Sequence, residues 1–89
     1  MNLAPSNFIC FSSKTIRTAL FKLESSLGRA TIETILQDME IYGMPLDDDR
    51  ISYMIADIEL AMRRIFGTEG GALIMERLRK ILIPDSVDK

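Results

Sequence analysis

Apolar residues recur along this chain every three or four positions, which is the spacing that amphipathic α-helices require. Four such stretches follow one another, and Gly28, Gly43 and Gly67 each stand after the last apolar position of a stretch. Glycine often ends a helix, because it adopts positive φ at no steric cost. The pattern therefore predicts an all-α fold, namely a compact four-helix domain with short glycine-terminated connections. The expected apolar stripes are Ile16, Ala19, Leu20, Leu23 and Leu27; Ile32, Ile35, Leu36 and Met39; Ile51, Ile55, Ile58, Met62 and Ile65; and Ile74, Met75, Leu78, Ile81 and Leu82.

The helical pattern extends over residues 13–84, and we expect this stretch to form one domain. Residues 1–12 do not share the pattern and are predicted to be an irregular N-terminal segment. Within that segment, the apolar run of residues 8–11 either docks on the helical body, pairs as an edge strand or stays disordered. Residues 85–89 are predicted to be a C-terminal tail, because Pro84 stops the preceding helix.

The third predicted helix, from about Asp49 to Phe66, is apolar on two faces. Its main stripe points to the core, whereas Tyr53 and Leu60 lie seven residues apart on nearly the opposite side. Such a helix is either central in its domain or packed against a partner chain. For the second case we expect Tyr53 and Leu60 to anchor the contact, with Arg64 near its rim.

Asp47, Asp48 and Asp49 lie at the start of this predicted helix. A calcium loop of the EF-hand type needs oxygen ligands at its positions 1, 3 and 5 and a glutamate at position 12. Counted from Asp47, positions 5 and 12 hold Ile51 and Ile58, so the motif fails. The triplet is instead predicted to cap the helix, where carboxylates accept from free N–H groups and favour the positive end of the dipole. We therefore expect no metal site.

The size and composition of the chain favour self-association. A chain of 89 residues buries only about 60–65% of the surface that its unfolded form exposes. Even so, 47% of its residues are hydrophobic. The lone Cys10 cannot form an internal disulfide, so association with a second copy is the remaining way to supplement the core. We therefore expect a homodimer.

Residues suited to catalysis are scarce in this chain. It has no histidine, which is the usual general base at neutral pH. Cys10 lies in the irregular segment without an obvious activating base, and Gly70-Gly71 is not followed by the lysine of a P-loop. We therefore expect a protein that is not an enzyme and uses no cofactor.

Charge and hydropathy restrict the partners. The formal net charge of −2 and the pI near 5.0 argue against a general polyanion binder. No stretch has the length of apolar residues that a membrane span requires, so we expect a cytoplasmic protein without a membrane partner. If the last two helices bring their basic residues together, the alternative function is a DNA-binding transcriptional regulator. That basic face would consist of Arg63, Arg64, Arg77, Arg79 and Lys80.

Several positions in the chain together resemble a known family. They are Leu27-Gly28, Gly43-Met44-Pro45-Leu46, Ala61, Ile65-Phe66-Gly67, Gly71, Met75 and Leu78. Over about residues 14–83, this combination is similar to the small all-helical output domains of the Nitrosopumilus type, from ammonia-oxidising archaea. The resemblance implies an archaeal effector or interaction module in signalling or transcriptional regulation. Taken together, the residues and the resemblance predict a non-enzymatic protein-interaction module that acts through an apolar helix face.

Overall fold

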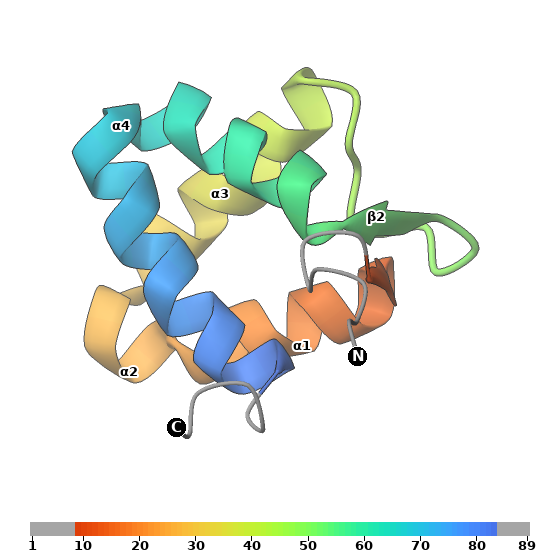
Figure 1. The fold of residues 1–89 in the computed structure, drawn as a ribbon, viewed down its shortest axis with the longest axis horizontal. Helices are drawn as coiled ribbons and strands as arrows, with labels where there is room; N and C mark the ends of the chain where they lie inside the picture. Colours follow the sequence, from red (N-terminus) through yellow and green to blue (C-terminus); the bar gives the residue numbers. More distant parts are fainter. Residues whose placement is uncertain (1–8, 84–89) are drawn as a thin grey trace, which may run out of the picture.

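The computed structural model describes residues 9–83, which form a mostly helical body with one small sheet (Figure 1). Its elements, in chain order, are β1 (Cys10–Ser12), α1 (Ser13–Lys22), α2 (Glu24–Leu27), α3 (Arg29–Ile41), β2 (Ser52–Met54) and α4 (Ile55–Leu82). The prediction of a compact helical protein is confirmed, but the description as all-α leaves out the two strands. The predicted tail and most of the predicted N-terminal segment lie outside the described residues.

The three glycines that punctuate the sequence all have positive φ, as predicted. The φ angles are 91° at Gly28, 82° at Gly43 and 84° at Gly67. Gly67 interrupts α4 with a non-helical conformation, so residues 55–66 and 68–82 form two halves that meet at a bend. These halves correspond to the third and fourth predicted helices, although Gly67 alone separates them. Figure 1 shows this bend, after which the second half descends toward α1.

The two strands pair antiparallel and join the start of α1 to the start of α4. Their register places Cys10 opposite Met54, Phe11 opposite Tyr53 and Ser12 opposite Ser52. Immediately beyond the pair, the backbone N–H and the side-chain hydroxyl of Ser13 both donate to the carbonyl oxygen of Ile51, at 2.9 and 2.8 Å. These bonds satisfy Ser13, which is fully buried. Of the alternatives for the apolar N-terminal run, strand pairing is therefore the one that holds for residues 10–12.

Strand β2 also corrects the predicted start of the third helix. The helix begins at Ile55 and not at Asp49, because residues 52–54 are extended and hydrogen-bonded to β1. An extended strand turns alternate side chains to opposite faces, and Tyr53 is accordingly buried between two more exposed neighbours. The helical spacing had predicted that Tyr53 and Leu60 share a helix face. This prediction is wrong, because Tyr53 belongs to β2.

The core draws on all the long elements and follows the predicted stripes closely. Its completely buried large side chains are Ile16, Leu20, Ile32, Ile35, Met39, Ile55, Ile58, Met62, Met75 and Leu78. Unbranched methionines fill irregular gaps between helices, which accounts for three of the six methionines of the chain. No helix within residues 9–83 is both long enough and apolar enough to cross a membrane.

Candidate functional site

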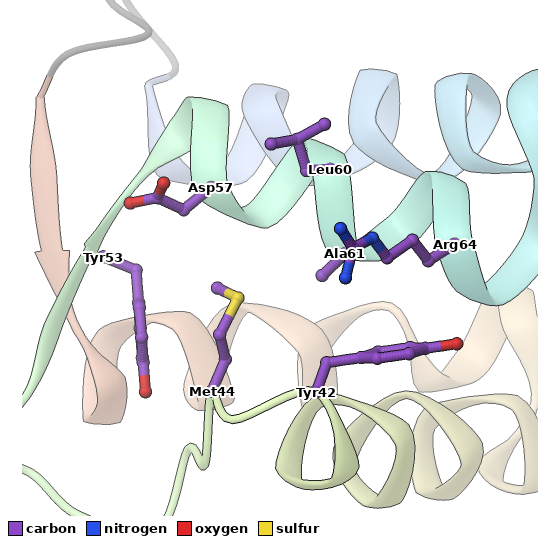
Figure 2. A pocket seen from close by; sticks show the side chains of 7 residues that line it. All are labelled: Tyr42, Met44, Tyr53, Asp57, Leu60, Ala61 and Arg64. Atoms are coloured by element: carbon purple, nitrogen blue, oxygen red, sulfur yellow. The ribbon is translucent and has the colours of Figure 1, made fainter.

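A hollow of about 330 Å³ opens between the first half of α4 and the segment that follows α3 (Figure 2). We call it the α3–α4 groove. One side is the helix α4, the other is the end of α3 with its connection, and β2 closes one end. The groove is lined by Tyr42, Met44, Tyr53, Asp57, Leu60, Ala61 and Arg64.

The α4 side of the groove arises from helical spacing. Ile58 and Met62 are completely buried, whereas Leu60 and Arg64 lie on the exposed side of the same helix. Leu60 keeps 56% of its surface exposed at the edge of the groove. The neighbouring Ala61 is buried and small, and it leaves room beside Leu60. The wall therefore combines one projecting apolar side chain with a recess.

Tyr53 forms the end of the groove nearest the sheet. Its ring is only 9% exposed, and its hydroxyl donates to the carbonyl oxygen of Pro45 at 2.9 Å. Burial raises the pKa of the Tyr53 hydroxyl, and the nearby negative charge of Asp48 raises it further. Tyr53 is thus a fixed, neutral wall of the groove and not the free surface anchor that the sequence predicted.

Arg64 and Tyr42 form the opposite end. The guanidinium carbon of Arg64 lies 5.7 Å from the centre of the Tyr42 ring, within the range of a cation–π contact. Figure 2 shows the arginine extended over the face of the ring, so that the contact joins α4 to the end of α3. Tyr42 is 41% exposed and adds aromatic surface to the groove.

Asp57 places the opposite charge near the sheet end of the groove. One of its carboxylate oxygens, Oδ2, accepts from the backbone N–H of Met54 at 3.2 Å and so caps the first turn of α4. A carboxylate has about four acceptor sites in all, so this cap leaves Asp57 able to accept from a further donor, such as a cationic side chain. The groove therefore has a negative charge toward one end and a positive charge toward the other.

All three residues that the sequence predicted for partner binding line this one groove. Leu60 and Arg64 occupy the positions that helical spacing implied, whereas Tyr53 reaches the groove from β2. Apolar and aromatic surface with a charge at each end suits contact with another polypeptide more than it suits a reaction. Sequence reasoning missed the other four lining residues, namely Tyr42, Met44, Asp57 and Ala61. Two of them carried a signal. Asp57 lies two helical turns before the oppositely charged Arg64, and Ala61 follows Leu60 on the flank of the second apolar face.

The five basic residues of the alternative function have several different neighbours in the structure. Arg63 and Arg79 both pair with Glu59, at 2.9 and 3.1 Å, and this carboxylate bridges the two halves of α4. The remaining three lie elsewhere. Lys80 lies 4.0 Å from Glu76, and it lines a hollow beside Leu73 together with Arg77. Arg64 contacts Tyr42.

The acidic triplet does not cap α4, so that prediction is wrong. Asp48 accepts from the backbone N–H and from the guanidinium of Arg50, each at 3.0 Å, and these bonds lower the pKa of the Asp48 carboxyl. Asp49 pairs with Arg17 at 3.2 Å. The triplet therefore shapes the connection before β2. Among residues 9–83, no three histidine, cysteine, aspartate or glutamate side chains are close enough together to hold a metal ion.

The chain was compared with family models, curated proteins and solved structures. No family model, no curated protein and no solved structure matches the chain. The resemblance to the Nitrosopumilus-type output domains therefore stays a prediction from the residues that carry it.

Proposed function

We propose that the protein is a non-enzymatic interaction module that binds through the α3–α4 groove and acts as a homodimer. The observation that carries the proposal is Leu60, which is 56% exposed at the edge of an apolar hollow. The resemblance to output domains suggests the setting, an effector unit of a signalling or transcriptional regulator. In that role, dimerisation would bring together two copies of the module, and with them two copies of each surface outside the dimer contact.

Physical chemistry supports a protein partner at this groove. Fully burying an exposed leucine is worth about 1.5–3 kcal/mol, so covering the exposed half of Leu60 contributes roughly 1 kcal/mol or more per copy. The exposed aromatic ring of Tyr42 provides rigid surface that loses little conformational freedom on binding, and the buried Tyr53 forms a fixed wall beside it. A domain of this size also gains from association, because its own core is small.

The oligomeric state in solution tests the proposal. We expect light scattering after gel filtration to give the mass of two chains at high micromolar concentration. The variant Leu60→Glu should be soluble and folded but monomeric, because a buried, unpaired carboxylate opposes association. Circular dichroism of the variant checks that its helices remain.

Leu73→Glu is the matched control. Leu73 is 52% exposed, nearly as much as Leu60, but it lies on the second half of α4 and lines a different hollow. The same substitution there should leave the dimer intact. A wild-type protein that is monomeric at high micromolar concentration contradicts the proposal, and so does an equal loss of dimer in both variants.

A further inference from the structure

The groove side of α4 carries charges arranged symmetrically about Leu60 and Ala61. Asp57 and Arg64 are seven residues apart, which is two helical turns, so both lie on the same side of the helix. Leu60 and Ala61 occupy the two positions midway between them. At a rise of 1.5 Å per residue, the two charges are separated by roughly 10 Å along the helix axis.

This arrangement is complementary to itself. A twofold axis that crosses α4 between Leu60 and Ala61 places a second α4 antiparallel to the first. Asp57 of each copy then faces Arg64 of the other, so two ion pairs form at once. The same rotation sets each Leu60 opposite the recess at Ala61 of the other copy, which is the small-against-large packing of facing helices.

We infer that the occupant of the α3–α4 groove is a second copy of this chain, packed antiparallel along the first half of α4, with Asp57 and Arg64 determining the pairing. The inference rests on the proposed function and adds its geometry. A different partner protein would need complementary charges, but it would not require them to be symmetric about the apolar centre. A twofold contact requires that symmetry, because each surface must complement its own copy.

The local contacts of both charges are compatible with this pairing. Asp57 uses one oxygen for the backbone N–H of Met54 and has further acceptor capacity. Arg64 is exposed, and its contact with Tyr42 is to the face of a ring, which leaves its N–H groups able to donate to a carboxylate partner. Both residues can therefore bind across the interface without giving up these contacts within the chain.

Charge reversal tests the inference through a mixing experiment. Arg64→Glu brings a new carboxylate against Asp57 of the other copy, and Asp57→Lys brings a new ammonium group against Arg64 of the other copy. Each variant alone should therefore dimerise at least ~10-fold more weakly, because like charges then face each other twice. Mixed in equal amounts, the two variants pair one doubly acidic surface with one doubly basic surface, so every facing pair is of opposite charge. We expect native mass spectrometry to detect the heterodimer, with a dissociation constant within about threefold of the wild-type value.

Two further variants separate pairing from folding. Arg77→Glu makes the same charge reversal away from the groove and should leave the dimer unchanged. If Asp57→Lys unfolds because the helix cap is lost, Asp57→Asn keeps an acceptor for Met54. Added to Arg64→Glu, it removes the facing negative charge and should recover at least threefold of the lost affinity.

The outcomes distinguish this inference from the proposed function. A heterodimer from two variants that are weak alone, or rescue by Asp57→Asn, supports the antiparallel pairing. Charge variants that dimerise like the wild type, while Leu60→Glu is monomeric, overturn the pairing and leave the interaction module in place. A monomeric wild type overturns both.

Discussion

At Gly71 the second half of α4 lies close to the backbone of the first half, and a methyl group there should separate them. A Cβ on Gly71 would lie 2.8 Å from the backbone nitrogen of Arg63 and 2.9 Å from the carbonyl carbon of Met62. Both obstacles are main-chain atoms of the first half of α4, so no side chain can rotate away to make room. Gly71→Ala must therefore push the second half outward.

The expected cost follows from two opposing effects. Alanine is favoured over glycine within a helix by about 1 kcal/mol. Overpacking a well-filled site costs about 1–3 kcal/mol, and rigid backbone on the far side favours the upper end of that range. We therefore expect Gly71→Ala to lower the free energy of unfolding by about 2 kcal/mol.

Gly70→Ala provides the matched comparison for this prediction. It gives the same gain in helix propensity, but its Cβ would meet the Cβ of Phe66 at 3.1 Å, where small shifts suffice. We expect Gly70→Ala to change stability by less than about 1 kcal/mol in either direction. Thermal unfolding at equal protein concentration should therefore separate the two variants by about 8–16 °C, at roughly 4–8 °C per kcal/mol. If Gly71→Ala melts at or above the temperature of Gly70→Ala, the close approach does not limit this site.

Two further predictions concern pH. The pKa of Tyr53 is raised above 10.0, so the folded state keeps this proton longer than the unfolded state, and stability falls as pH rises from about 10 through the folded pKa. Tyr53→Phe should remove that part of the alkaline loss in urea titrations at about pH 9 to 11; an unchanged slope would show that the burial of the hydroxyl is not responsible. The pKa of Asp48 is lowered below 3.8, so its contribution is present above that pH and is lost as pH falls through the folded pKa. Asp48→Asn should accordingly be less stable than the wild type at neutral pH, and the difference should shrink in acid; a difference that stays constant down to about pH 2 would contradict this reason.

Local rules were sufficient to predict the helical stretches and the glycines that follow them, but not the start of the third predicted helix. The apolar stripes depend on a period of about 3.6 residues, and glycine at positive φ depends on the conformation of one residue. Both are encoded over short stretches, which is why the positions of Gly28, Gly43 and Gly67 were correct. The sheet depends on the pairing of residues 10–12 with residues 52–54. Strands of three residues are too short to display a clear alternation, so the sequence offered no comparable signal.

The lining residues of the groove also divide into those that local spacing could predict and those that it could not. Leu60 and Arg64 lie on one helix, so their spacing alone relates them. Tyr53 was selected by the same spacing although it belongs to β2, and it lines the groove for a different reason. Met44 and Tyr42 come from the end of α3 and its connection, and their place depends on how α3 lies against α4. Short-range periodicity does not determine that crossing, so these residues could not be predicted.

The hydrogen bonds of Ser13 to Ile51 have a consequence for how the chain acquires its structure. The two residues are 38 positions apart, and a loop of that length must close before either bond can form. Helices α1 and α3 need no such closure and can form while the sequence beyond them is still being synthesised. Strand β1 is synthesised before β2 and cannot pair until β2 has followed it, so its backbone groups stay open to other strands in the meantime. A strand that is made early is thus among the last elements to reach its final structure.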